Sequence, residues 1–228
     1  PYEAIPMGYW SYYLLWMVAM WLFQYPPLLL GVVAFFLLRR FIPDPWVWLR
    51  TASKIRALRS QIDANPSNTT ARRDLARIYL ERMRPRTALK LLDEARQRHP
   101  DDPELLFLTG LARVRARRYE EALPALVEAI EADPRTGFGE PFKVAGDALW
   151  KLNRLEECED AYERYTDANS SSLEGWYKLA RVRRERGEKP EAKRAMDELF
   201  RTWRQIPGYS RRKQWRWWLR ALPARLGV

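Results

Sequence analysis

The feature that most constrains this chain is an internal period of 34 residues. Pro66, Pro100 and Pro134 follow one another at that spacing, in Asn-Pro, His-Pro and Asp-Pro dipeptides. Proline disfavours helix at the residue before it, so each dipeptide favours the end of one helix and the start of a turn. A period in the thirties is typical of stacked helical pairs, in which each pair contacts only its neighbours. The sequence therefore predicts an all-α solenoid.

Small residues recur with nearly the same period, at points where two antiparallel helices must approach closely. On the expected first helices they are Ala76, Gly110, Gly146 and Ala180, and on the expected second helices they are Ala88, Ala122, Cys158 and Ala192. Both series are spaced 34, 36 and 34 residues. The two extra residues fall in a Gly-rich insertion around Gly137, Phe138 and Gly139, which leaves the stacking of the third pair open. Pro85 and Pro190 stand near the start of second helices, where the missing N–H costs little.

These patterns resemble the tetratricopeptide repeat (TPR) family, whose motif combines a large residue early in the first helix, small residues in both helices and a closing proline. The matching residues are, in the first repeat, Leu75, Ala76, Tyr79, Ala88, Leu92, Ala95 and Pro100; in the second, Leu106, Gly110, Ala122, Leu126, Ala129 and Pro134; and in the fourth, Trp176, Leu179, Ala180 and Ala192. The third repeat departs most, with Cys158 in place of alanine and Tyr165 where a small residue is usual. The resemblance covers about residues 69–204 and implies a protein-binding scaffold, not an enzyme.

The chain is expected to have four parts. Residues 1–42 form a membrane anchor, residues 43–65 a juxtamembrane helix or half repeat, residues 66–206 four TPR repeats, and residues 207–228 a basic, Trp-rich C-terminal helix. The anchor is predicted because no charged residue lies between Tyr9 and Leu38, a run longer than a buried core helix requires. No Lys or Arg precedes this run and no clear cleavage site follows it, so a cleavable signal peptide is not expected.

Pro26 and Pro27, with Gln24 close by, interrupt the middle of the apolar run. Free backbone groups and a polar side chain are costly in hydrocarbon, so two arrangements compete. In a helical hairpin these residues reach the far interface, as the clustering of aromatic residues favours. In a single span the helix is kinked at the proline pair. Both arrangements place the repeats on the cytoplasmic side of a bacterial inner membrane, because six basic residues between Arg39 and Arg59 follow the run.

Residues suited to catalysis or metal binding are scarce. Cys158 is the only cysteine and His99 the only histidine, which excludes a disulfide or a Cys/His metal site within one chain. Cys158 is expected to be a buried packing thiol, and His99 a cap or surface residue. Two acidic pairs would begin second helices, where carboxylates complement the helix dipole: Glu120 with Glu121 and Glu156 with Glu157. With no phosphate-binding loop either, no enzyme, metal or cofactor is expected.

The resemblance also implies a partner-binding groove, because first-helix side chains line the concave face in this family. The corresponding residues are Arg73, Arg77, Phe107, Leu111, Lys143, Asp147, Trp150, Tyr177, Arg181 and Arg184. This basic and aromatic mixture favours a protein partner, whereas the alternative is a solvated face with incidental aromatics. The Lys/Asn pattern by which some family members clamp a chaperone's C-terminus is missing, because Arg73 and Arg77 replace the first pair.

The C-terminal segment is the most basic part of a chain whose net charge is +11. Residues 200–228 hold eight basic residues and no acidic one. A helix here would place Trp215, Trp218, Leu219 and Leu222 on one face and Lys213, Arg216 and Arg220 on the other, with Trp217 on the basic side. It is expected to cap the fourth repeat or to lie on anionic lipid or a membrane partner, and the two can coexist if the cap shows its basic face to the membrane. The candidate contact residues are Arg212, Lys213, Trp215, Arg216, Trp217, Trp218 and Arg220.

These patterns predict a membrane-anchored TPR scaffold that docks proteins at the cytoplasmic face, as an accessory subunit or assembly factor of a membrane complex. Its expected partners are subunits of that complex and membrane lipid. The alternative function is binding of anionic lipid or nucleic acid through the basic tail. Nucleic acid is the less favoured partner, because the positive charge lies beside the apolar segment and in the tail while the middle of the chain is about neutral.

Overall fold

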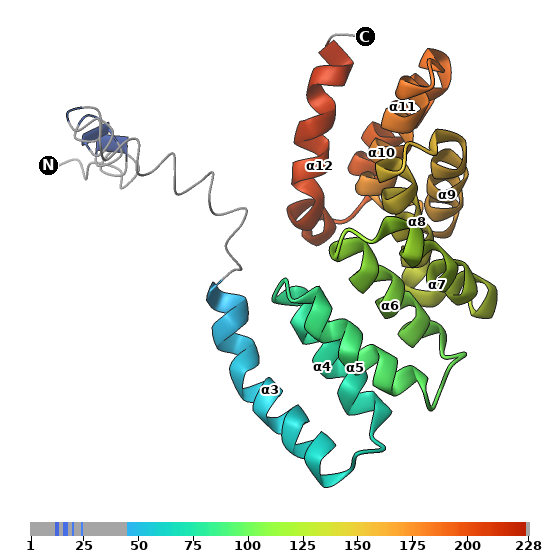
Figure 1. The fold of residues 1–228 in the computed structure, drawn as a ribbon. Helices are drawn as coiled ribbons and strands as arrows, with labels where there is room; N and C mark the ends of the chain where they lie inside the picture. The colour runs from blue at the N-terminus through green and yellow to red at the C-terminus, as the bar shows by residue number, and fades with distance from the viewer. Residues whose placement is uncertain (1–11, 14–15, 18–19, 21–23, 25–44, 227–228) are drawn as a thin grey trace, which may run out of the picture. The chain divides into compact units, whose positions relative to one another are not determined.

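The computed structural model describes residues 12–13, 16–17, 20, 24 and 45–226. Between residues 45 and 226 the chain forms ten α-helices, α3 to α12, with one 3-10 helix and no strand (Figure 1). The predicted all-α class is therefore confirmed. The chain divides into two compact units, residues 1–50 and 51–228, and all the repeats lie in the second unit.

Four antiparallel helical hairpins make up most of the second unit. Hairpins 1 to 4 pair α4 (Thr69–Glu81) with α5 (Pro85–Arg96), α6 (Pro103–Arg115) with α7 (Tyr119–Ala132), α8 (Glu140–Lys151) with α9 (Leu155–Ala168), and α10 (Leu173–Glu185) with α11 (Lys189–Gln205). In hairpins 1 to 3 the second helix packs on the first helix of the next hairpin. In hairpin 4 the second helix, α11, packs on α12 instead. This is the stack of four pairs that the 34-residue period predicts.

Side-chain caps explain why three of the first helices begin where they do. Asn68 accepts a hydrogen bond from the Ala71 amide at 2.9 Å, and Ser172 accepts one from the Gly175 amide at 3.2 Å. Asp102 accepts hydrogen bonds from the Glu104 and Leu105 amides in the first turn of α6. A short polar side chain at this position satisfies N–H groups that the first helical turn leaves unpaired. The turn before each first helix therefore also fixes the register of its hairpin.

Small residues allow the two helices of a hairpin to touch. Ala76, Ala88, Ala122 and Cys158 have no exposed surface. A Cβ atom added to Gly110 would lie 2.5 Å from the Leu126 side chain, so only glycine fits there. The predicted helix contacts are thus present at both periodic series, although Ala192 is only half-buried at the last hairpin.

The turn inside each hairpin contains one left-handed residue at an equivalent position. Met83, Arg117, Asn153 and Gly187 have φ values of 57°, 63°, 59° and 84°. Their spacing is again 34, 36 and 34 residues. The left-handed conformation costs an L-residue about 1–2 kcal/mol because its Cβ approaches the following carbonyl oxygen. Met83 and Arg117 therefore close their hairpins in a strained conformation, whereas Asn153 and Gly187 are residue types that adopt it more readily.

Hairpin 3 absorbs its insertion without leaving the stack. The extra residues form the 3-10 helix η1 (Thr136–Phe138), followed by Gly139 at φ 78°, and α7 still packs on α8. The large Tyr165 fits because glycine stands opposite it: a Cβ added to Gly175 would lie 2.8 Å from the Tyr165 ring. The Tyr165 hydroxyl donates a hydrogen bond to Ser172 Oγ at 3.0 Å. A tyrosine–glycine pair thus replaces the usual small residue.

Helix α3 (Pro45–Ala64) precedes the repeats. Ile55, Leu58 and Ile62 pack against the apolar cluster of hairpin 1. Arg59 donates a hydrogen bond to the Tyr79 hydroxyl at 2.6 Å. The side chains of α3 therefore cover the face of α4 that has no preceding repeat.

Helix α12 (Gly208–Leu226) packs against α10 and α11 (Figure 1), so it caps the fourth hairpin. The Trp218 ring stacks on Trp203 with centroids 5.3 Å apart, and Ala221 is fully buried. The Leu173 amide donates to Gln214 Oε1 at 2.8 Å, which ties α12 to the start of α10. Of the two arrangements expected for the tail, the structure contains the cap.

The predicted apolar face of the tail needs a correction. Trp217 and Trp218 both pack against the hairpin, whereas Trp215 and Leu219 are 46% and 43% exposed. Gln214 lies between Trp217 and Trp218 around the helix and accepts the hydrogen bond from the start of α10. This contact turns the side of α12 that carries these three residues toward the hairpin. The amphipathic pattern alone missed it because polar Gln214 belongs to the buried side.

The predicted membrane anchor, as a hairpin or a kinked span, lies mostly outside the described residues. The six described residues between 12 and 24 are helical and exposed. No helix that the structure describes is long and apolar enough to cross a bilayer.

Replacing Arg117 by glycine should stabilise the repeats. Glycine adopts a positive φ without the steric penalty, although it loses more backbone entropy on folding. We expect the free energy of unfolding in urea to rise by about 0.5–1 kcal/mol. The matched control is Arg118→Gly, because Arg118 has φ −96° and gains nothing from glycine. Equal stability changes for the two variants would contradict the strain at Arg117.

Candidate functional site

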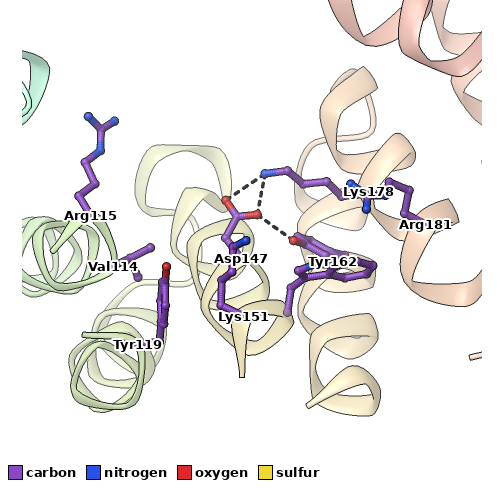
Figure 2. A pocket seen from close by; sticks show the side chains of 9 residues that line it. Val114, Arg115, Tyr119, Asp147, Lys151, Tyr162, Lys178 and Arg181 are labelled. Carbon is purple, nitrogen blue, oxygen red and sulfur yellow. Dashed lines mark hydrogen bonds and ion pairs between the residues drawn. The ribbon is translucent and has the colours of Figure 1, made fainter. Parts of the chain in front are cut away.

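The candidate site is a pocket of about 380 Å³ formed by the first helices of hairpins 2 to 4 (Figure 2). It is lined by Val114, Arg115, Tyr119, Asp147, Trp150, Lys151, Tyr162, Lys178 and Arg181. Four of these side chains are basic, one is acidic and three are aromatic. Helices α6, α8 and α10 contribute most of them, so the stacking of hairpins creates the pocket.

The single carboxylate of the pocket already has its partners. Figure 2 shows Lys178 and Tyr162 both directed at Asp147: Lys178 Nζ lies 2.7 and 2.9 Å from its two oxygens, and the Tyr162 hydroxyl donates to Oδ1 at 2.8 Å. Burial, followed by the Asp147 charge, raises the pKa of Tyr162, so its hydroxyl stays a donor. Asp147 is therefore a fixed structural anion between hairpins 3 and 4.

A chain of charges extends this network along α8 and α10. Lys178 also pairs with Glu174 at 2.6 Å, and Lys143 pairs with Glu140 at 2.7 Å and with Glu174 at 3.6 Å. Although burial opposes it, the two ammonium groups lower the pKa of Glu174 below its ordinary value. Burial opposes the shift at Lys143 too, yet the neighbouring carboxylates raise its pKa. Ion pairs thus hold both lysines in place across the junction.

Two cations of the pocket face solvent. The Arg181 guanidinium lies 4.9 Å from the centroid of the Trp150 ring, a cation–π contact. Lys151 is the last residue of α8 and is exposed. Among the residues that the structure describes, neither side chain forms an ion pair. An anionic group beside an apolar surface would find both donors and an aromatic wall here.

The predicted groove residues are only partly brought together. Asp147, Trp150 and Arg181 line the pocket, and Lys143 belongs to its charge network. Arg184, on α10, is exposed.

The groove residues of hairpins 1 and 2 hold the repeats together. Arg73 and Arg77 both pair with Glu104 across α4 and α6, Arg73 at 2.7 Å. Phe107 and Leu111 are half-buried against the apolar clusters of neighbouring hairpins. These four side chains therefore serve contacts between repeats.

Tyr177 packs against helix α12, which caps the fourth hairpin. Its ring lies 5.5 Å from that of Trp217, and Lys178 Nζ lies 5.9 Å from the same indole. Arg220 covers the Trp217 ring, at 4.6 Å from its centroid. Helix α12 thus closes the fourth-hairpin end of the face on which the groove was predicted.

Six lining residues were missed from the sequence: Val114, Arg115, Tyr119, Lys151, Tyr162 and Lys178. Arg115 and Lys151 lie four residues after Leu111 and Asp147, so one further helical turn along the predicted face would have found them. Tyr119 and Tyr162 come from second helices, and no periodic signal marks them. Their contribution depends on how far each hairpin is offset from the next.

The remaining reactive residues have structural positions. Cys158 is fully buried, and its thiol donates to the Gly146 carbonyl at 3.3 Å. Burial, with the nearby Asp147 charge, raises the pKa of Cys158 to about 12. His99 is exposed in the turn after α5. The two acidic pairs lie in the first turns of α7 and α9, as predicted. Within the described part of the chain, no group of three or more His, Cys, Asp or Glu residues could hold a metal ion.

Stacked helical hairpins with a shared pocket on their first helices define an α-solenoid of the protein-interaction type. A sequence model of the tetratricopeptide repeat matches residues 73–135 and 144–210, which is more than half of the chain. The chain therefore belongs to the TPR family, as the repeat pattern indicated. The TPR fold is typically a non-enzymatic scaffold for protein–protein interaction.

Solved structures agree on the fold. A crystal structure of MamA superposes with a TM-score of 0.61 at 18% identity, over 67% of this chain and 92% of that one. MamA residues 41 to the end from Desulfovibrio magneticus RS-1 gives a TM-score of 0.63 at 15% identity, over 70% and 91% of the two chains. A search of curated protein sequences returned no match.

The burial of Cys158 predicts that its thiol reacts slowly in the folded chain. A pKa of about 12 instead of 9 leaves roughly 1,000-fold less thiolate at pH 8, and the thiolate is the reactive form. Cys158 should therefore react with an aqueous disulfide reagent only as fast as the repeats unfold. A Ser67→Cys variant provides the control, because Ser67 is exposed and its thiol should react at once. Rapid modification of Cys158 in the folded chain would contradict its burial.

Proposed function

We propose that this chain is a membrane-tethered TPR scaffold that docks a protein partner through the pocket of hairpins 2 to 4. It would act at the cytoplasmic face of a bacterial inner membrane, as an accessory subunit or assembly factor of a membrane complex. The observation that carries the docking proposal is the pair Lys151 and Arg181, two exposed cations that border Trp150 and the pocket.

The charges of the pocket favour an acidic segment of a protein. Asp147 is held by Lys178, and Arg115 donates to the Leu80 carbonyl, so Lys151 and Arg181 are the cations of the pocket that a partner's carboxylate would meet. Trp150 and Tyr119 add apolar area beside these cations. A segment with a carboxylate next to an apolar side chain would satisfy both parts, and charge-assisted hydrogen bonds to guanidinium groups are among the stronger polar contacts. Three hairpins contribute to the pocket, which suits an extended peptide.

The tether rests on the sequence of residues 9–38, which contain no charged residue. Such a run is long enough for a bilayer, and the basic residues that follow it favour a cytoplasmic position for the repeats. A scaffold held at the membrane would meet membrane-complex subunits at a high effective concentration.

A double variant tests the pocket. Lys151→Ala with Arg181→Ala removes the two exposed cations, each able to contribute a charge-assisted hydrogen bond of about 1.5 kcal/mol. We expect proteins that co-purify in mild detergent to fall about tenfold or more, measured by quantitative mass spectrometry. The control is Lys193→Ala with Arg194→Ala, which removes equal charge from exposed positions on α11. Equal loss in both variants, or in neither, would place the partner elsewhere on the chain.

Topology is tested by labelling. A Ser67→Cys variant in a Cys158→Ala background should resist an impermeant maleimide in intact cells and react after permeabilisation. A thiol at Gln24 separates the two anchors: it should react in intact cells if the anchor is a hairpin, and remain unlabelled if a single span buries it. Labelling at position 67 in intact cells would move the repeats to the outside.

A further inference from the structure

Helix α12 has an exposed surface that the capping role does not use. We call it the basic face of α12; it consists of Tyr209, Arg212, Lys213, Trp215, Arg216 and Leu219, all exposed. The opposite side of the same helix is held by the fourth hairpin through Gln214, Trp218 and Ala221. The basic face is therefore presented outward by a fixed helix, and no folding on binding is needed to form it.

The positive charge of this face is not offset by ion pairs within the described part of the chain. Among the described residues, Arg212, Lys213 and Arg216 form no ion pair, and no Asp or Glu occurs from residue 200 to the end of the chain. Several arginines of the hairpins are paired instead: Arg183 and Arg186, for instance, both pair with the buried Glu159. The exposed side of α12 thus carries positive charge that no carboxylate of its own segment offsets.

Large apolar side chains lie among these cations. Tyr209, Trp215 and Leu219 are 69%, 46% and 43% exposed. The Arg216 guanidinium lies 5.9 Å from the centroid of the Trp215 ring, so charge and aromatic surface are presented together. A face used only for solubility would not expose an indole, a phenol and a leucine beside three cations.

We infer that the basic face of α12 lies on the surface of an anionic phospholipid bilayer. Arg and Lys near such a surface each gain about 1 kcal/mol from the headgroup charge, and Trp, Tyr and Leu favour the boundary between headgroups and acyl chains. Three cations on one short face are few for a nucleic acid, whose affinity comes from many phosphate contacts. The inference goes beyond the proposed docking function and shares no residue with the pocket, which remains open to a protein.

The test uses the full chain in lipid nanodiscs with an environment-sensitive fluorophore on Leu219→Cys. Native Cys158 is buried and stays unlabelled. Emission should shift to the blue in discs containing phosphatidylglycerol, but not in discs of phosphatidylcholine alone, and 0.5 M salt should reverse much of the shift. A fluorophore at Glu131→Cys, exposed on α7, should respond equally to both lipids. Co-elution of the chain with neutral discs reports on the proposed tether separately.

Charge removal completes the experiment. Arg212→Gln, Lys213→Gln and Arg216→Gln together should lower the ratio of bound to free face on the order of 100-fold, because three contributions of about 1 kcal/mol are lost. Lys90→Gln, Lys193→Gln and Arg194→Gln remove the same charge from other exposed positions and should leave the shift intact. The inference is overturned if both triple variants behave alike or if the two lipids give the same emission. It is also overturned if only an added single-stranded oligonucleotide changes the emission.

Discussion

The close approach of two helices within each hairpin is the contact on which the rest of the structure depends. Ala76 and Ala88 in hairpin 1, and Gly110 and Ala122 in hairpin 2, bring backbones together where a larger side chain has no space. Interiors are packed so densely that one added carbon must displace its neighbours. Hairpins closed in this way stack through the second helix of one and the first helix of the next.

The offset between neighbouring hairpins determines which side chains meet on their shared face. It places Lys178 of hairpin 4 against Asp147 of hairpin 3, and both beside Tyr162 from a second helix. Partly buried charges are tolerated at such a junction when each has a partner, because desolvation is then offset by short ion pairs. The cations left over, Lys151 and Arg181, define the face that a partner can approach. Helix α12 covers Tyr177 at the fourth-hairpin end of the predicted groove, and the pocket is lined by residues of hairpins 2 to 4.

The sequence pattern predicts the features that recur in every repeat, but not those that depend on a single contact between distant residues. It predicted the small-residue series, the turns marked by Xaa-Pro dipeptides and the C-terminal helix. It placed Tyr177 in an open groove because the repeat period does not show that the Trp217 indole covers this side chain. The positive φ of the turn residues was not predicted either. Glycine and asparagine, at 187 and 153, are residue types that adopt a positive φ readily, whereas Met83 and Arg117 are not, and in those two the hairpin turn imposes it.

By itself the sequence determined the helical class, the number of hairpins and the residues that must be small, because these follow from local periodicity and from steric limits on helix approach. Only the tertiary structure decided which charges are neutralised, which side of α12 is buried, and which side chains share the pocket. These depend on distances between segments that are 30 or more residues apart, such as Asp147 and Lys178. The free energy of an ion pair or an aromatic contact falls steeply with distance, so small differences in hairpin offset decide which partners meet.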